Sequence, residues 1–410
     1  MARPVLRSLL AGASITAVLL GPPAARSMSI SDPPAPATAA QAVLAPVEFS
    51  SIEGWNDDGL AAAVAVFAAS CRSMLTALSN DAARRAWTAA CASAQAVPQD
   101  DDQAARRMLE QNFNAWRISP SSGADGFLTG YFEPEVEGAL VRSDAFPVPL
   151  YRQPDDLIVL GEDDIRRPAG FALAGARNGT SGLEPYPTRQ EIETGALAGR
   201  GLELVHVRDK ITAFFIHVQG SARIRLAEGG VMRIGFAAKN GHPYRSIGRH
   251  VAETWNIAPE EMTADRLRDW LAAHADQADA VMWHNKSFIF FRRIDEADDA
   301  LGPLGALGVA LTPLRSLAVD RSLHVLGAPL WIDAMLPDAQ SAQGGTSPFR
   351  RLMIAQDTGS AIVGPARGDI FFGTGADAGH QAGLVRHAGR FTLLWPKGLA
   401  LPAWAKAAQD

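Results

Sequence analysis

The sequence lacks the residues and patterns on which several common functions depend. Its 410 residues include only two cysteines, and none of its nine histidines forms an H-E-x-x-H motif or a Cys/His cluster with zinc spacing. We therefore expect neither a metal nor a cofactor. Lysine and arginine total 38 against 44 acidic residues, a net charge of -6. This chain has no excess of basic residues, which argues against nucleic acid as a partner.

Long apolar runs are also absent, except near the N-terminus. There, Arg3 and Arg7 precede an apolar run of 12 residues from Leu9 to Leu20, and small residues follow up to Ser27. This pattern predicts a signal peptide over residues 1–27, because the run is too short to span a membrane. No later run approaches 18 apolar residues, so we expect an exported mature chain without a transmembrane segment. No cysteine lies directly after the run, where a lipid anchor would be attached.

The two cysteines, Cys71 and Cys91, lie in alanine-rich segments with helical spacing. An even count in an exported chain permits one disulfide, and antiparallel packing of the two segments could bring the thiols together. Two buried free thiols are the alternative. In either case we expect a structural role.

The pattern along the chain predicts a helical N-terminal region followed by a β-rich body, and the length favours two domains. After a Pro- and Ala-rich leader over residues 28–46, helices are expected over 58–78, 80–97 and 101–118. Two later helices are expected, one opened by the capping box Thr188–Glu191 and one over 264–275. The expected strands are 202–208, 212–219, 222–226, 231–236, 288–294, 309–311, 330–334, 352–356, 370–372 and 391–395. No long helix separates the later strands, so a small barrel is favoured over a parallel sheet.

Two carboxylates stand out in a glycine-rich stretch, Asp357 in Asp-Thr-Gly-Ser and Asp369 in Gly-Asp-Ile-Phe-Phe-Gly, twelve positions apart. Glycine allows a ligand close to the backbone, and flanking apolar residues can raise the pKa of a carboxyl group enough for it to act as a general acid. On spacing alone, the Asp-Thr-Gly and Gly-Asp sequences are more often turns than functional sites. The first resembles an aspartic-protease motif, but that chemistry needs a second copy, which the chain lacks. The later Gly373-Thr-Gly-Ala-Asp-Ala-Gly379 does not match the glycine spacing of a dinucleotide loop.

Seven stretches of the chain resemble the membrane-bound lytic murein transglycosylase A family, whose C-terminal part carries the 3D domain. They occur in family order over about residues 120–400. The stretches are Leu128-Thr-Gly-Tyr-Phe-Glu-Pro134, Tyr186-Pro-Thr-Arg189, Phe215-Ile-His-Val-Gln-Gly-Ser221, Ala238-Lys-Asn-Gly-His-Pro-Tyr-Arg-Ser-Ile-Gly248, Asn285-Lys-Ser-Phe-Ile-Phe-Phe291, Gly302-Pro-Leu-Gly305 and the block from Ala355 to Gly383.

The resemblance implies a mainly β fold with a double-psi β-barrel domain, an inserted second β-domain and an N-terminal helical region. The barrel domain would comprise residues 47–134 and 281–410, and the insert residues 135–280. A groove between the two would bind peptidoglycan glycan strands. Because family members can be lipoproteins of the outer membrane and this chain lacks the required cysteine, we expect a periplasmic enzyme, either free or associated with the outer membrane by another route.

The resemblance also implies the reaction. The β-1,4 bond between N-acetylmuramic acid and N-acetylglucosamine would be cleaved without water, giving a 1,6-anhydromuramoyl end. Asp369 matches the single catalytic aspartate, and Asp357 matches a supporting acid. One aspartate suffices in principle, because it can protonate the leaving oxygen and then accept the proton of the substrate's own C6 hydroxyl. The alternatives are a non-catalytic peptidoglycan-binding protein and a glycoside hydrolase, which would need a second carboxylate.

Several polar residues in the matching stretches could line the groove and bind sugar hydroxyls, N-acetyl groups or peptide carboxylates. The candidates are Thr129, Tyr131, Gln219, Ser221, Lys239, Asn240 and Tyr244. His217 alternates with apolar neighbours, which is typical of a histidine satisfied within a strand. Each of these residues could instead have a purely structural role.

Overall fold

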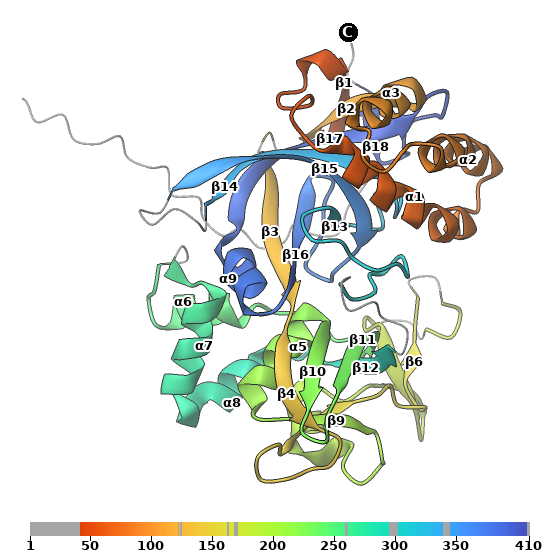
Figure 1. Ribbon diagram of the computed structural model, residues 1–410. Coiled ribbons are helices and arrows are strands. Elements are labelled where there is room, and N and C mark those ends of the chain that lie inside the picture. The colour runs from red at the N-terminus through yellow and green to blue at the C-terminus, as the bar shows by residue number, and fades with distance from the viewer. Residues whose placement is uncertain are drawn as a thin grey trace, which may run out of the picture. The chain divides into compact units, whose positions relative to one another are not determined.

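The computed structural model describes residues 42–407 except 122, 124, 162–163, 168–170, 259–260, 295–301 and 339–344. The expected signal peptide and the leader up to residue 41 therefore lie outside the described residues. The described chain is mainly β, with one nine-stranded sheet, one six-stranded sheet and one three-stranded sheet. Helices cluster beside the first two sheets (Figure 1).

The nine-stranded sheet is assembled from both ends of the chain. Its order is β14-β15-β13-β16-β3-β17-β2-β1-β18, and β14 also pairs with β17. The strands are β1 (Ala42–Val47), β2 (Phe113–Pro120), β3 (Gly126–Glu133), β13 (Ser316–Val319), β14 (Pro329–Pro337), β15 (Thr346–Asp357), β16 (Arg367–Thr374), β17 (Arg386–Pro396) and β18 (Ala405–Ala407). Asp357 ends β15, Asp369 lies on β16 and the Leu-Thr-Gly-Tyr stretch lies on β3. These strands are near neighbours in the sheet, with β13 between β15 and β16.

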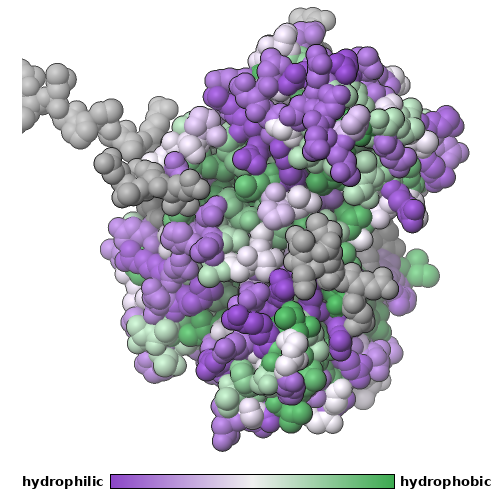
Figure 2. All heavy atoms as spheres, in the orientation of Figure 1, coloured by the Kyte–Doolittle hydropathy of each residue, from purple (hydrophilic) through white to green (hydrophobic). Residues whose placement is uncertain are grey.

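Three helices follow β1, namely α1 (Leu60–Ala77), α2 (Asp81–Gln95) and α3 (Asp102–Asn112), after the short 3-10 turn Phe49–Ser51. The side chains of Asn80 and Asp101 cap α2 and α3. Cys71 of α1 and Cys91 of α2 are joined by a disulfide. Although α1 is long and apolar enough to cross a membrane, half of it is buried, and it packs on α2, α3 and β15. The surface over this region is mostly hydrophilic (Figure 2), as expected for a core helix.

Two boundaries in this region differ from the expectation. The third helix ends at Asn112 instead of continuing to residue 118, and Phe113–Pro120 forms β2. Phe113 and Ala115 are buried on either side of the exposed Asn114, the alternation of a strand. The expected leader likewise ends too late, because Ala42–Val47 forms β1 and pairs with β2 and β18.

The six-stranded sheet has the order β12-β11-β10-β4-β9-β5. Its strands are β4 (Glu135–Ala139), β5 (Val148–Tyr151), β9 (Glu203–Val207), β10 (Ser221–Leu226), β11 (Val231–Lys239) and β12 (Ile289–Ile294). β4 begins two residues after β3 ends, so the chain passes directly from one sheet to the other (Figure 1). The small third sheet contains β6 (Ile158–Val159), β7 (Gly175–Gly179) and β8 (Gly182–Pro185).

The expected strand over residues 212–219 is wrong. Residues 210–219 form helix α5 (Lys210–Gln219), which Asp209 caps at the start and Gly220 ends in the left-handed conformation. Its apolar residues cover one face of the six-stranded sheet, where Ala213 and Ile216 join the core. A short apolar run does not distinguish a buried helix from a buried strand, and the capping residues were the better signal.

The remaining helices of the described chain each have ten residues or fewer. They are α4 (Arg189–Glu191), which opens with the expected capping box and continues as a π-helical turn over Ile192–Ala196, then α6 (Ile247–Thr254), α7 (Ala264–Ala273), α8 (Ala275–His284) and α9 (Ala376–Leu384). The expected helix over 264–275 is confirmed as α7, which ends at Ala273, whereas α8, which begins at Ala275, was not expected. The segment 309–311, expected as a strand, forms only an isolated bridge between Leu304 and Ala310.

Candidate active site

Asp369 is the third residue of β16 and lies directly opposite Thr129 of β3. The hydroxyl of Thr129 donates a hydrogen bond of 2.5 Å to Oδ1 of Asp369. Arg367, two residues earlier on β16, donates from its guanidinium to the same hydroxyl at 2.7 Å. Because the arginine can only donate, the threonine oxygen accepts from Arg367 and its proton points to Asp369. Two successive hydrogen bonds, from Arg367 to Thr129 and from Thr129 to Asp369, thus hold Oδ1 of the aspartate. Oδ2 takes no part in them.

Asp357 is the last residue of β15, and it faces the same position of β13 as Asp369 does. Ala318 of β13 pairs with Asp357 on one side and with Asp369 on the other. Two strand spacings separate the backbones of the two aspartates, about 10 Å. Oδ1 of Asp357 accepts hydrogen bonds of 2.9 Å from the backbone amides of Ala306 and Thr358, and Oδ2 accepts one of 2.9 Å from the hydroxyl of Tyr131.

Burial dominates the electrostatics of this site. It raises the pKa of Asp357 from 3.8 to about 6, against the opposing effect of its three hydrogen bonds. Burial also raises the pKa of Asp369, while the charge of Arg367 and the hydrogen bond from Thr129 act to lower it. The pKa of Tyr131 is raised by burial and then by Asp357, so its phenol remains a donor. The sheet therefore presents two carboxyl groups that hold protons to higher pH than free aspartate does.

The glycine of the Leu-Thr-Gly-Tyr stretch has a packing role. A Cβ on Gly130 would lie 2.7 Å from the Cα of Ala382 in α9, so only glycine lets this helix pack against β3. Thr129 and Tyr131 flank this glycine, and alternate residues of a strand share a face. The ring of Tyr131 lies 5.3 Å from that of Phe371, the residue opposite it on β16. The close helix therefore supports the strand that presents both hydroxyls to the aspartates.

The candidates at the end of β11 separate into different environments. Nζ of Lys239 lies 3.3 Å from the hydroxyl of Ser360, which follows β15, so this lysine reaches the chain segment that carries Asp357. Tyr244 keeps 36% of its surface exposed. Desolvation of its hydroxyl by the surrounding protein raises its pKa, and the charges of Arg189 and Arg386 oppose that effect. Arg386 pairs with Thr129 across β17 and β3.

Asn240, by contrast, is fully buried. Its amide nitrogen donates to the carbonyls of Pro187 and Lys286, and its oxygen accepts from the amide of Phe288, each at 2.9 Å. These bonds connect three segments of the chain and leave no exposed surface for a ligand. The structure thus places this candidate in a structural position, where the sequence pattern had suggested contact with substrate.

Gln219 and Ser221 lie where α5 passes into β10. The side-chain oxygen of Gln219 accepts a hydrogen bond of 3.1 Å from the backbone amide of Phe132, which ties α5 to the end of β3. Ser221 is largely buried at the start of β10. His217 lies on α5, not on a strand, and its Nδ1 accepts from the amide of Ile289 at 3.2 Å. Burial keeps the pKa of His217 well below its ordinary value, so it is neutral.

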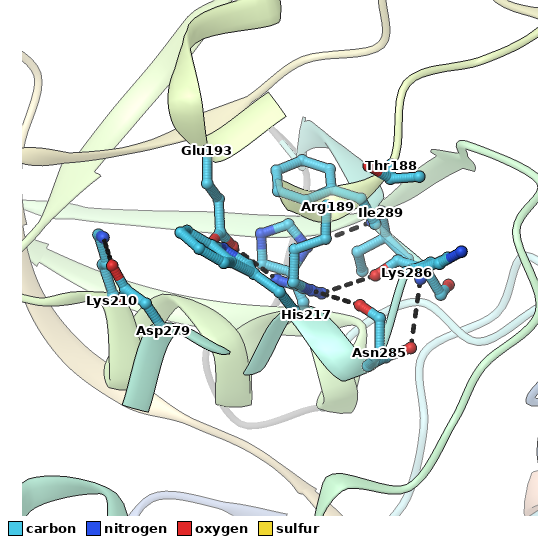
Figure 3. A network of polar contacts seen from close by, with 12 residues as sticks. Thr188, Arg189, Glu193, Lys210, His217, Asp279, Asn285, Lys286 and Ile289 are labelled. Carbon is cyan, nitrogen blue, oxygen red and sulfur yellow. Dashed lines mark hydrogen bonds and ion pairs between the residues drawn. The ribbon is translucent and has the colours of Figure 1, made fainter. Parts of the chain in front are cut away.

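Sequence reasoning missed the buried arginine of the Tyr-Pro-Thr-Arg stretch. Arg189 donates to the backbone carbonyls of Asn285 and Ser287 at 3.1 and 2.8 Å and pairs with Glu193 at 3.0 Å. Figure 3 shows this network beside His217, with the separate Lys210–Asp279 pair at its edge. Asn240 donates to the carbonyls of Pro187 and Lys286, which lie beside the residues of this network. The two sets of hydrogen bonds together fix the loop that carries Lys239 and Tyr244. The sequence signal for this buried arginine was a charged side chain directly after the helix-capping Thr188.

Arg367 and Ser360 were also missed. Arg367 was detectable, because residues two apart on a strand share a face, but Ser360 meets Lys239 only through folding. Among the described residues, no group of three or more His, Cys, Asp or Glu side chains is placed to hold a metal ion. The functional groups that the described residues bring together at this site are carboxyl, hydroxyl and guanidinium groups.

Comparison with known proteins identifies the family. Residues 127–292 match the MltA specific insert domain and residues 315–395 match the 3D domain. Membrane-bound lytic murein transglycosylase A of Escherichia coli K12 is 31% identical over 296 residues, covering 70% of this chain and 71% of the relative. The mainly β fold together with these two matching regions defines the class of this chain, the lytic murein transglycosylases. The chain belongs to the membrane-bound lytic murein transglycosylase A family.

Solved structures agree with this assignment. The membrane-bound lytic murein transglycosylase of Agrobacterium tumefaciens superimposes with a TM-score of 0.76 at 37% identity, covering 87% of this chain and 98% of that one. MltA of Neisseria gonorrhoeae in a monoclinic form has a TM-score of 0.71 at 31% identity, covering 91% and 99%. MltA of E. coli with bound chitohexaose has a TM-score of 0.60 at 25% identity, covering 88% and 93%.

Proposed function

We propose that this protein is a peptidoglycan lytic transglycosylase. It cleaves the β-1,4 bond between N-acetylmuramic acid and N-acetylglucosamine without water and leaves a 1,6-anhydromuramoyl end. The observation that carries the proposal is Asp369, a carboxyl group with a raised pKa on the central strands, held by Thr129 at 2.5 Å. Family membership supports the substrate, peptidoglycan glycan strands, and a family member was solved with the related sugar chitohexaose.

Asp369 acts first as an acid and then as a base. Its raised pKa favours the protonated form needed to give a proton to the leaving glycosidic oxygen. The carboxylate left behind then accepts the proton of the C6 hydroxyl as that oxygen attacks the anomeric carbon. Thr129 stays on Oδ1 throughout, so Oδ2 exchanges both protons. The nucleophile belongs to the substrate ring, which removes the entropic cost of positioning water.

Asp357 supports this reaction without taking part in bond formation. Both of its oxygens are already engaged, one by two backbone amides and the other by Tyr131. The second carboxylate of a glycosidase needs a free oxygen to attack the sugar or to activate water, whereas both oxygens of Asp357 are occupied. Its charge helps to keep the pKa of Tyr131 high, and its own pKa is raised in part by Asp369. Through these hydrogen bonds Asp357 connects the segment after β15 to Tyr131 on β3, beside the catalytic Asp369.

The domain division that accompanies this function is a double-psi β-barrel of residues 47–134 and 281–410 with an insert of residues 135–280. It is supported by the order of the nine-stranded sheet, in which β14 pairs with both β15 and β17. The direct passage from β3 to β4 supports the first boundary. Glycan binds between the two parts, near Thr129, Tyr131, Lys239 and Tyr244, with Gln219 and Ser221 behind them. The enzyme works in the periplasm after export, free or associated with the outer membrane.

Product analysis tests the proposal. Wild-type protein incubated with purified sacculi should release muropeptides with 1,6-anhydro ends, detected by mass spectrometry. In ¹⁸O-water the new muramoyl end should carry no label. Asp369→Asn should lower turnover by at least ~10²–10⁴-fold, because an amide provides neither the acid nor the base, while glycan binding persists. Asn can still accept from Thr129, so the fold should be retained.

Three other results would contradict this assignment of the reaction or of the catalytic residue. Labelled reducing ends would indicate a hydrolase that uses water. Binding without any product would indicate a peptidoglycan-binding protein. Turnover by Asp369→Asn close to that of wild type would show that another residue carries the reaction. Lys210→Gln, which changes a lysine of α5 that pairs with Asp279 of α8, serves as a matched control that should behave as wild type.

A further inference from the structure

A buried glutamine precedes Asp357 in the chain. Gln356, Ser70 of α1 and Ser316 of β13 are each at most 1% exposed. The amide nitrogen of Gln356 donates to the hydroxyl of Ser70 at 2.8 Å, and its amide oxygen accepts from the hydroxyl of Ser316. The hydroxyl of Ser70 donates in turn to the carbonyl of Val66 at 2.8 Å. One glutamine side chain thus connects a helix to a strand inside an apolar core.

Gln356 is also the point at which β15 changes its register against β13. Leu317 of β13 pairs with Ala355. The next residue of β13, Ala318, pairs with Asp357. Gln356 is therefore one extra residue in β15, a β-bulge, and bulges beside active sites redirect side chains. Because a shift of one residue moves a side chain to the other face of a strand, this bulge decides where Asp357 points.

One segment of the chain binds both the bulge and the carboxylate. The carbonyl of Gln356 accepts a hydrogen bond of 3.0 Å from the amide of Leu307. The preceding amide, that of Ala306, donates to Oδ1 of Asp357 at 2.9 Å. A Cβ on Gly305 would lie 2.6 Å from the carbonyl oxygen of Gln356, so only glycine allows this approach. Two successive amides therefore depend on the geometry of the bulge.

We propose that Gln356 is a positioning residue for the reaction. Its side chain, held between α1 and β13, maintains the bulge that directs Asp357 to Tyr131. The inference rests on the proposed function, in which Asp357 supports Asp369. A polar network in a core contributes little more stability than apolar residues of the same shape. It does fix one arrangement of the chain, because any slip of β15 leaves a buried polar atom without a partner.

Turnover and stability of substituted proteins test the assignment. Gln356→Met keeps an unbranched side chain but removes both hydrogen bonds, and it should lower turnover of sacculi by folded protein about tenfold, the scale of one lost hydrogen bond to a charged group. Adding Ser70→Ala and Ser316→Ala removes the hydroxyls left without a partner, so this triple variant should regain most of the stability in urea but not the turnover. The amide of Thr312, which donates to Ser316, is partly exposed and can bind water. The control is Thr392→Val, a change of a buried residue of β17 in the same sheet, and its turnover should equal that of wild type.

Two further measurements separate positioning from general support of the fold. A double-mutant cycle shows whether Gln356 acts through Asp357. Asp357→Ala protein has no carboxyl group to direct, so adding Gln356→Met should lower its turnover by less than about twofold. Hydrogen exchange is independent of the reaction. The amides of Ala306 and Leu307 should exchange faster in Gln356→Met and in the triple variant than in wild type, and should stay protected in Thr392→Val.

Four outcomes decide between the explanations. Recovery of turnover together with stability in the triple variant would overturn the assignment, because any well-packed core would then suffice. Additive losses in the cycle would overturn it too, since Gln356 would then act independently of Asp357. Unchanged exchange at Ala306 and Leu307 would show that the bulge does not need the glutamine. Wild-type protein that gives no anhydro products would instead refute the proposed reaction, and the exchange rates would still decide whether Gln356 maintains the bulge.

Discussion

Replacing Asp357 by asparagine should make the protein more stable and less active at neutral pH. The side chain is nearly isosteric, and the amide oxygen can still accept from the backbone amides of Ala306 and Thr358. The substitution removes a carboxylate that burial makes unfavourable, as its raised pKa of about 6 indicates. It also removes the acceptor for Tyr131 at Oδ2, which weakens the support of β3 and β16, the strands that we propose carry the reaction.

The magnitude and its pH dependence follow from the pKa. A folded-state pKa of about 6 against an ordinary value of 3.8 corresponds to at most about 3 kcal/mol of unfolding free energy. Below pH ~4 the carboxyl group is protonated in both states, so wild type and variant should differ little. As the pH rises through about 6 the folded state loses the advantage of the bound proton. The variant should therefore gain stability from pH ~4 upward and reach its full advantage above pH ~6.

Urea unfolding of both proteins at several pH values between 4 and 8 measures this difference, since other titrating groups cancel in the comparison. Turnover of sacculi by the variant should fall, but less than in Asp369→Asn. A variant that is less stable than wild type at pH 7.5 would refute the electrostatic argument. A variant with wild-type turnover would remove Asp357 from the site, and a loss equal to that of Asp369→Asn would indicate two equivalent catalytic carboxylates.

Three further changes should act through single contacts. Thr129→Val removes a hydrogen bond that lowers the pKa of Asp369, so the limb of the pH–rate profile set by this carboxyl should move to higher pH, whereas Thr129→Ser should leave it in place; identical profiles would contradict the relay. Cys71→Ala opens a loop of 20 residues and should cost about 3 kcal/mol in urea unfolding, and two titratable thiols in denatured, unreduced wild type would show that no disulfide forms. Gly241→Ala combines φ +81° with a Cβ 1.8 Å from a backbone nitrogen, so it should destabilise more than Gly230→Ala, whose φ is +80° in open space; equal losses in thermal unfolding would rule out the clash.

Local pattern was sufficient where a segment determines its own conformation. The capping side chain of Asn80 predicted the start of α2, and the Thr188–Glu191 capping box predicted α4. The same local information was misleading for residues 212–219. That segment has enough apolar residues for a buried strand, and its helical state depends on packing against the six-stranded sheet. The end of α3 at Asn112 was likewise decided by pairing of the next residues with β1 and β17.

The sequence by itself determined the family, the two aspartates and the hydroxyls of Thr129 and Tyr131, because these lie in short stretches whose residue types and order are specific. Only the tertiary structure decided what each does. Asp357 and Asp369 are twelve positions apart in the chain, yet strand pairing gives them one shared neighbour, Ala318. Asn240 has the same polar chemistry as a sugar ligand, but folding buries it among backbone groups. Burial and pairing depend on contacts between distant segments, and no local pattern records those contacts.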